Sequence, residues 1–172
     1  GGNDMDEAIV RYLHNKYNHV IGLLTAEQVK IRIGRAVDQP DDPVMPVKGR
    51  NAATGLPCVR EVRASEIQEA LKEPVEEIIA AVQRVMENTP PELTGDILED
   101  GVVLTGGASR LSGLDELLTR RTGVLCRLAE NPSDCVALGT GKALKFVGVL
   151  SSGVYDISRF TTSQVDSIPR AQ

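Results

Sequence analysis

Two glycines stand where a short apolar run meets a polar turn, in the segment GVVLTGGASRLSGL at residues 101–114. The apolar run predicts a buried strand, and the leucines that follow predict a helix. Gly106 and Gly107 place no side chains over the backbone of this corner, and the N-terminus of a helix favours an anion or a polar edge. The segment is therefore either a tight turn without a ligand or a loop against which a flat or phosphorylated ligand lies.

A second candidate contact is a charged pair in LTAEQVKIRIG, residues 24–34. Glu27 and Lys30 are three residues apart, so they share one face of a predicted helix. A carboxylate there can accept hydrogen bonds from ribose hydroxyls, and the Lys30 ammonium can pair with Glu27 or face a base. The alternative is an ordinary exposed ion pair, which the local sequence favours.

Other residue types that carry chemistry form no recognisable set. The sequence has no arrangement expected of a hydrolytic triad, a metal cluster or a Walker-type lysine loop. Cys58, Cys126 and Cys135 form no CxxC motif, so we expect reduced thiols and no zinc site. His14 and His19 have no partner that the sequence reveals, and both are expected on the surface.

The composition restricts the class of protein. The chain has 172 residues, is 41% hydrophobic and carries a net charge of −5. An acidic chain without clustered Lys and Arg argues against nucleic acid as the main partner. No apolar run approaches the length of a membrane span. The chain starts with glycine rather than methionine, so we expect it to be a fragment.

Two helices are predicted at the start of the chain. The first carries an apolar stripe at helical spacing, made of Met5, Ile9, Tyr12 and Leu13. In the second, Thr25 and Gln28 predict a capping box at the N-terminus. Leu24 and Val29 predict a hydrophobic staple beside it, and Gly34 is expected to end the helix.

The segment at residues 38–57 changes character. It contains four prolines, which exclude a helix over most of its length. We expect two extended segments, Val44–Arg50 and Cys58–Arg63, joined by a turn at Asn51–Leu56.

Pro74 divides the helical stretch that follows. Ser65 and Gln68 predict a capping box at the start of that stretch. Because proline lacks an amide hydrogen and clashes with the preceding turn, we expect a short helix to Glu73 and a long one that begins at Pro74. The TPPE at residues 89–92 is expected to stop the long helix. Its apolar stripe, expected in the core, is Val75, Ile78, Ile79, Val82, Val85 and Met86.

Strands and helices alternate in the rest of the chain. The pattern predicts strands at residues 102–105 and 124–128, and helices at Leu111–Thr122 and Ser133–Val149. A helix between two short strands indicates a right-handed crossover onto a parallel pair. The polar segment from Ser151 onwards is expected to be loose.

Six segments then occur in a characteristic order: MDEAIVRYLHNKYN, IGLLTAEQVKIRIG, ATGLPCVREV, TPPEL, DGVVLTGGASRLSGLDELL and NPSDCVALGTGKAL. Through them the chain, up to about Leu150, resembles the C-terminal half of the MreB family of bacterial actin-like, rod-shape-determining proteins. Gly1 and Gly2 match the glycines that follow the second phosphate loop in that family. The resemblance therefore implies that both phosphate-binding loops, and the residues that position the attacking water, belong to a half that this sequence lacks.

The fold that the resemblance implies is α/β, the actin-like ATPase (ribonuclease H-like) fold, with its second lobe present here. Residues 1–73 would form a small upper α+β subdomain of helices and a hairpin. Residues 74–150 would form a larger α/β subdomain with the adenosine loop, and residues 151–172 a loose C-terminal tail.

The same resemblance implies ATP or ADP as the cofactor, with Mg²⁺ held mainly through the absent half. The nucleotide-binding residues would be Glu27, Gln28, Val29, Lys30, Gly106, Gly107, Ala108 and Ser109. No catalytic or metal-ligating residue is implied in this half, and enzymatic activity stays open. Phosphoryl transfer needs a positioned metal, a phosphate cradle and a water, so we expect the chain alone not to hydrolyse ATP.

The role that the resemblance implies is self-association into filaments that organise cell-wall synthesis and so determine a rod shape. The long helix and the upper subdomain would supply subunit contacts. The expected location is the cytoplasm, at the inner face of the membrane, which the absent half would contact, and the expected partners are membrane-linked cell-elongation proteins. The alternatives are a sugar kinase or chaperone-type ATPase of the same fold, and a non-hydrolysing actin-like adaptor.

Overall fold

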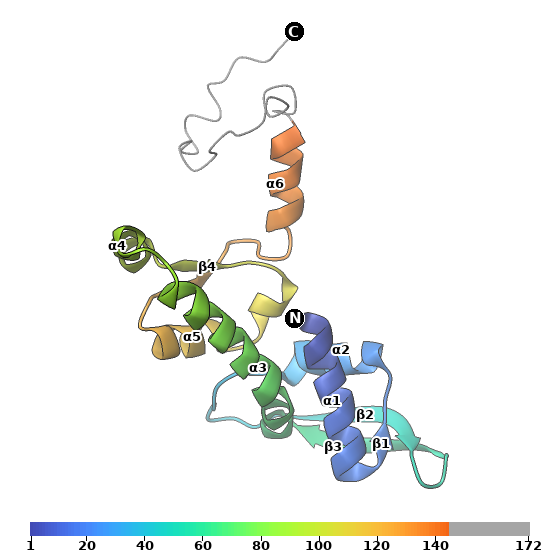
Figure 1. Cartoon of the computed structure of the whole chain (residues 1–172). Helices are drawn as coiled ribbons and strands as arrows, with labels where there is room; N and C mark the ends of the chain where they lie inside the picture. The colour runs from blue at the N-terminus through green and yellow to red at the C-terminus, as the bar shows by residue number, and fades with distance from the viewer. Residues whose placement is uncertain (145–172) are drawn as a thin grey trace. The chain divides into compact units, whose positions relative to one another are not determined.

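The computed structural model describes residues 1–144 of the chain (Figure 1). Contacts divide the chain into two units, residues 1–135 and residues 136–172. The first unit contains both sheets and nearly all of the helices. The second is described only through most of helix α6, which spans Cys135–Leu144. The predicted tail at residues 151–172 and the last part of the predicted helix Ser133–Val149 lie outside the described residues.

A three-stranded antiparallel sheet forms the first part of the chain. Its strands, in the order β1-β2-β3, are β1 (His19–Val20), β2 (Val44–Asn51) and β3 (Pro57–Arg63). The Asn51 side chain accepts two backbone N–H groups of the turn, and Gly55 takes a positive φ of 73° there. This turn chemistry favours the hairpin, and the predicted extended segments are confirmed.

Helices α1 (Gly2–Tyr17) and α2 (Leu23–Ile33) pack against this sheet and against each other. The predicted stripe of α1 is confirmed, because Met5, Ile9 and Leu13 are fully buried. Burial of each such side chain contributes about 1.5–3 kcal/mol to the hydrophobic stabilisation of the fold.

The predicted start of α2 is wrong. Gly22 is the N-cap and the helix begins at Leu23, two residues before Thr25, so Thr25 lies inside the first turn. Leu24 is 77% exposed while Val29 is fully buried, so the two side chains form no staple. Thr25 and Gln28 have the spacing of a capping box, but Thr25 does not occupy the N-cap position that such a box requires. Gly34 does end the helix, and its N–H donates to the carbonyl of Lys30 at 2.9 Å.

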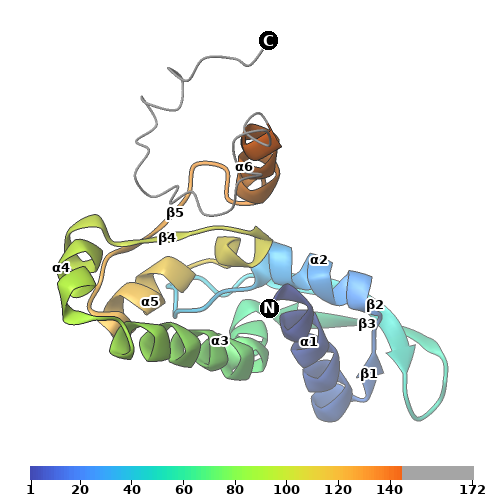
Figure 2. The ribbon, with the colours of Figure 1, turned by 45° about the horizontal axis from the view of Figure 1, so that its top comes forward.

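Helix α3 (Ala64–Glu87) continues through Pro74, so the predicted division into two helices is wrong. A proline inside a helix costs about 3 kcal/mol. The apolar residues before and after it form one buried stripe, which opposes that cost by packing against α1 and against α5 (Leu114–Thr122). The members of the stripe are Ile67, Leu71, Val75 and Ile79. Figure 2 shows α3 running as one helix from the three-stranded sheet to α4.

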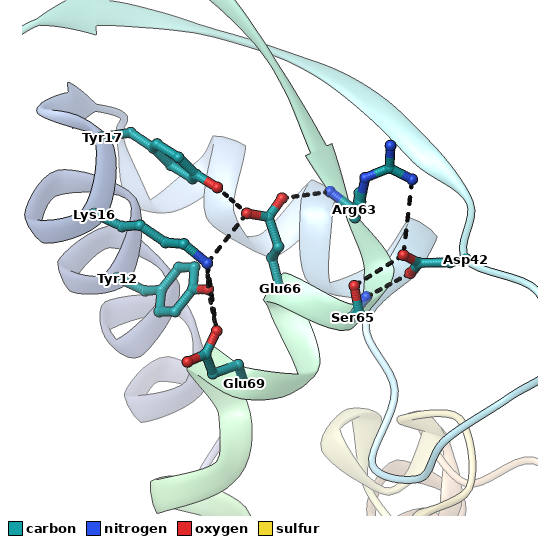
Figure 3. A network of polar contacts seen from close by, with 8 residues as sticks. All are labelled: Tyr12, Lys16, Tyr17, Asp42, Arg63, Ser65, Glu66 and Glu69. Carbon is teal, nitrogen blue, oxygen red and sulfur yellow. Dashed lines mark hydrogen bonds and ion pairs between the residues drawn. The ribbon is translucent and has the colours of Figure 1, made fainter.

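The N-terminus of α3 is capped from another segment, and the predicted capping box of Ser65 and Gln68 is wrong. Asp42, in the loop before β2, accepts the backbone N–H of Ser65 at 2.7 Å and its hydroxyl at 2.9 Å. Glu66 accepts the N–H of Arg63 at 2.9 Å. Figure 3 shows these contacts. The backbone hydrogen bond from Ser65 is the largest influence on Asp42, and it lowers the pKa of that carboxyl below its ordinary value.

The second part of the chain contains a parallel pair of strands, as predicted. Strand β4 (Val102–Leu104) pairs with β5 (Cys126–Leu128), and α5 lies between them in sequence. Helix α4 (Pro91–Asp100) was not predicted, and none of its residues is buried. Val85 of the predicted core stripe of α3 is 68% exposed, close to where α3 ends.

Helix α5 begins three residues later than predicted. Residues Gly107–Arg110 form a 3₁₀ turn, η1, and Gly113 precedes α5 with a positive φ of 74°. A Cβ at position 113 would collide with the side chain of Val37. The chain therefore changes direction between η1 and α5 at a residue that has to be glycine.

The first part of the chain is joined to the second by backbone contacts as well as by apolar packing. The N–H of Ala36 donates to the carbonyl of Ser112 at 2.7 Å, and Arg35 forms an isolated parallel bridge with Ser112. One cluster of buried residues includes members from both parts, among them Met5 and Leu118. The division into subdomains at residues 73 and 74 stays a prediction.

Candidate functional site

A cavity of about 380 Å³ lies where the end of α2 meets the glycine corner. The structure therefore brings together the two segments that the sequence singled out separately. Three of the eight predicted binding residues line this cavity: Lys30, Gly107 and Ala108. The complete lining is Lys30, Ile31, Arg32, Gly34, Gly107, Ala108, Arg110, Leu111, Ser112 and Ser133.

The glycine corner is held by its own hydrogen bonds. Gly106 has a positive φ of 86°, and its N–H donates to the carbonyl of Pro132 at 2.6 Å. The buried hydroxyl of Ser109 donates to the carbonyl of Gly106 at 2.6 Å. Gly106 and Ser109 thus fix the shape of the loop and do not line the cavity. The N–H of Gly106 is already used within the protein, so it is not free to bind a ligand.

Gly107 leaves space open at the wall of the cavity. A Cβ at this position would meet no heavy atom within 4 Å, and the backbone there does not take a positive φ. A larger side chain could therefore be accommodated without backbone strain, and it would occupy space at the cavity. The absence of a side chain keeps this space available to a ligand.

On the other wall, Lys30 forms an ion pair that sequence reasoning missed. Its Nζ lies 2.8 Å from Oδ1 of Asp6 on α1 and donates to the carbonyl of Gly2 at 3.0 Å. The side chains of Lys30 and Asp6 are only 13% and 9% exposed. A buried carboxylate needs a cation far more than an exposed one does. Lys30 therefore pairs with Asp6, and the expected pairing with Glu27 is wrong.

The other predicted residues of α2 lie away from the cavity lining. Glu27 and Gln28 are exposed, one turn before the residues that form the wall. Val29 is fully buried in the core. Val29 therefore supports the helix and does not face a ligand.

The charge of the lining suits an anion. Lys30, Arg32 and Arg110 are cations, and none of the described residues that line the cavity is acidic. Asp6 balances Lys30, so Arg32 and Arg110 carry the positive charge of the site. Concentrated charge of one sign in a hollow attracts ligands of the opposite sign. Sequence reasoning missed both arginines, although Arg32 and Arg110 each lie within one of the two singled-out segments.

The cavity also offers apolar surface. Ile31, which is 73% exposed, and Leu111 both contribute to its lining. Apolar walls beside a few polar groups are typical of sites for small ligands. The arrangement fits a molecule with a flat, weakly polar part and an anionic part.

Residues 1–144 contain neither a cluster of metal ligands nor a membrane-spanning helix. No group of three or more His, Cys, Asp or Glu side chains in this range is placed to hold a metal ion. No helix in this range has both the length and the apolar character needed to cross a bilayer.

The sequence is similar to one protein family over most of its length. A family model described as MreB/Mbl protein matches residues 1–152. Cell shape-determining protein MreB of Escherichia coli K12 is 45% identical over 147 residues, which are 86% of this chain and 42% of that protein. Cell shape-determining protein Mbl of Bacillus subtilis 168 is 41% identical over 83% of this chain and 43% of its own length. The chain spans less than half the length of these curated relatives.

Solved structures show the same similarity. MreB5 of Spiroplasma citri bound to AMPPNP matches with a TM-score of 0.80 at 32% identity, over 88% of this chain and 45% of that one. The same protein bound to ADP matches with a TM-score of 0.80 at 31% identity, over 93% and 47%. A MamK double helical filament matches with a TM-score of 0.63 at 20% identity, over 77% and 41%, which shows the fold alone.

Proposed function

Because the family model covers residues 1–152, the chain belongs to the MreB/Mbl protein family, and we propose that it forms the adenosine side of an ATP site in a filament-forming protein that determines cell shape. The observation that carries the proposal is the cavity shared by the end of α2 and the glycine corner. A relative with the same fold binds the adenine nucleotides AMPPNP and ADP, which supports this choice of ligand.

Each wall of the cavity has a separate part in the proposal. Ile31 and Leu111 contact the base, and Gly107 lets the nucleotide approach the backbone closely. Arg32 and Arg110 attract the negative charge of the ligand. Glu27 lies on the same exposed face of α2 as Ile31, four residues earlier, and accepts hydrogen bonds from the ribose hydroxyls.

The lysine at the wall has a positioning part. Lys30 is held by Asp6 and by the carbonyl of Gly2, so it fixes the end of α2 relative to α1. Its charge is already balanced, so it contributes less than the arginines to attraction of an anion.

The binding experiment uses a chimera in which this chain replaces the matching part of E. coli MreB. We expect Gly107→Val to weaken binding of a fluorescent ATP analogue by roughly tenfold or more, equivalent to about 1.4 kcal/mol, because the side chain fills space that the ligand needs. Gly107→Ala should have a smaller effect. Gly95→Val in α4 is the control, since Gly95 lies outside the cavity lining.

Two results would contradict the proposed site. One is a Gly107→Val chimera that binds as tightly as the unmodified chimera. The other is an unmodified chimera that is folded but binds no adenine nucleotide, which would favour the non-hydrolysing adaptor.

The chain alone should not hydrolyse ATP. Phosphoryl transfer needs a metal ion, a phosphate cradle and a positioned water. We assign these to the N-terminal half that the resemblance to the MreB family implies and that this sequence lacks. The measurement is phosphate release by the purified 172-residue chain with Mg²⁺ and ATP. Turnover that Glu27→Gln abolishes would contradict this assignment.

The cellular part of the proposal is a filament at the inner face of the cytoplasmic membrane that organises cell-wall synthesis with membrane-linked elongation proteins. The relatives named as cell shape-determining proteins support this role. The test is whether the chimera restores a rod shape to E. coli cells depleted of their own MreB. Cells that stay round while they contain folded, nucleotide-binding chimera would contradict it.

A further inference from the structure

The sequence predicted His19 on the surface, but its side chain is buried and the residue is only 1% exposed. It lies on β1, beside Gly49 of the middle strand β2. A Cβ at position 49 would be 2.8 Å from the imidazole ring, so the glycine makes room for the ring. Gly49 pairs in turn with Cys58 of the edge strand β3. The ring of His19 therefore reaches across the middle strand to the thiol of Cys58.

Two contacts define which nitrogen of the His19 ring carries the hydrogen. Nε2 of His19 is 3.1 Å from the carbonyl oxygen of Val47, and Nδ1 is 3.2 Å from Sγ of Cys58. A carbonyl can only accept, so Nε2 carries the hydrogen and donates it. In the neutral ring Nδ1 is then a bare acceptor, and the S–H of Cys58 donates to it. The backbone thus orients the ring with its basic nitrogen toward the thiol.

A nucleophile, a base and a group that orients the base are the parts of an activated thiol. Cys58 is partly exposed, so small reagents in solution can reach it. We propose that Cys58 is a reactive thiol with His19 as its base, and that small peroxides modify it. This site is separate from the candidate nucleotide cavity, whose lining contains neither residue.

The reaction balances with a peroxide as the oxidant. The thiol proton moves to Nδ1 of His19, and the sulfur attacks one oxygen of hydrogen peroxide. An S–O bond forms as the O–O bond breaks, and the departing hydroxide takes the proton from the imidazolium to give water. The sulfur is oxidised to a sulfenic acid, the peroxide is reduced, and His19 returns to its neutral form.

The other two cysteines of the chain, Cys126 and Cys135, provide a comparison for Cys58. Cys135 is also partly exposed, but its S–H donates to the backbone carbonyl of Asn131 at 3.1 Å, and a carbonyl cannot take up the proton. Cys126 is buried. Of the three thiols, only that of Cys58 is both accessible and within hydrogen-bonding distance of a base.

The test measures the reaction of each cysteine in the folded 172-residue chain by peptide mass spectrometry. Alkylation by iodoacetamide gives the rate, and trapping with dimedone after hydrogen peroxide detects the sulfenic acid. A free cysteine is only a few per cent thiolate at neutral pH, so we expect Cys58 to react on the order of tenfold faster than Cys135 and to collect most of the dimedone. Equal rates, or a faster Cys135, would overturn the proposal.

A variant tests the part of the base. His19→Gln keeps a side chain that can donate to the carbonyl of Val47 but offers no basic nitrogen. In a variant that melts as the unmodified chain does, we expect the rate at Cys58 to fall to that at Cys135. An unchanged rate at Cys58 would overturn the assignment of His19 as the base. If the variant does not fold, the comparison of Cys58 with Cys135 in the unmodified chain still decides.

Discussion

At the scale of residues, a network of polar side chains holds α1 against α3 (Figure 3). Lys16 lies 3.4 Å from Glu66 and 3.5 Å from Glu69, while the hydroxyls of Tyr17 and Tyr12 donate to the same two carboxylates. Burial, assisted by the hydrogen bond to Glu69, raises the pKa of Tyr12 to about 12. The network keeps its carboxylates charged and its phenols neutral at physiological pH.

Glu66 predicts how stability depends on acid. Burial opposes its charge, but hydrogen bonds from Tyr17, the Arg63 backbone and Lys16 outweigh burial and lower its pKa below the ordinary 4.5. A lowered pKa contributes stability that is present above pH 4.5 and is lost as pH falls through the folded-state value. Glu66→Gln should therefore reduce the free energy of unfolding by about 1–2 kcal/mol at neutral pH and by less in acid.

The measurement is urea unfolding across an acid series of buffers, with Glu7→Gln as the control on the exposed face of α1. If Glu66→Gln lowers the free energy of unfolding by the same amount at every pH, the charge of Glu66 does not stabilise the fold as proposed.

The buried pair of Lys30 and Asp6 gives a second prediction at this scale. Asp6→Asn would leave the ammonium of Lys30 buried without its counter-charge. We expect a loss of about 3 kcal/mol in the free energy of unfolding. Glu27→Gln, at an exposed position on α2, the helix of Lys30, should change the free energy of unfolding by less than about 0.5 kcal/mol. Similar losses in the two variants would contradict the assignment of Asp6 as the specific partner of Lys30.

Sequence reasoning at the scale of residues succeeded where a local pattern was sufficient. The glycine corner was identified because two glycines after an apolar run are visible in a short segment. The partner of Lys30 and the burial of His19 were not predictable in this way. Both depend on residues far away in the sequence, Asp6 in one case and Gly49 in the other.

At the scale of elements, tertiary packing decided where local rules failed. Pro74 ends a helix by every local criterion, yet α3 continues because its buried stripe keeps one phase on both sides of the proline. The start of α3 likewise depends on Asp42 from another segment and on Glu66, not on the predicted capping box of Ser65 and Gln68. The two strands of the hairpin were predicted well, because proline, glycine and asparagine restrict the backbone locally, but the short strand β1 was not predicted.

The connection between η1 and α5 gives a prediction at this scale. Gly113→Ala should lower the free energy of unfolding by about 1–3 kcal/mol, since the position has a positive φ and the new Cβ would collide with Val37. Gly95→Ala is the matched control, because Gly95 lies inside α4 with open space around it. That change should raise stability by about 0.5–1 kcal/mol.

Thermal and urea unfolding of the two variants provide the measurement. If Gly113→Ala is as stable as the unmodified chain, residues 111–113 do not constrain the junction between the two parts of the chain as described.

At the scale of the whole molecule, the actin-like α/β fold expected from the order of six motifs is confirmed by the solved structures that match. The family is also confirmed. Sequence reasoning could reach this level because the motifs span nearly the whole chain. It could not reach the composition of the site, because Arg32 and Arg110 become neighbours only when α2 packs against the loop after β4.

The most direct test of the proposed site is photochemical labelling of the chimera with 8-azido-ATP, followed by identification of the modified peptides. The base of a nucleotide in the cavity would lie beside Ile31 and Leu111. We therefore predict that label on this chain is concentrated in the peptides that contain residues 23–34 and 105–112, and that excess ATP removes it. Label that excess ATP removes but that lies in the β2–β3 hairpin or in α4 would contradict the account.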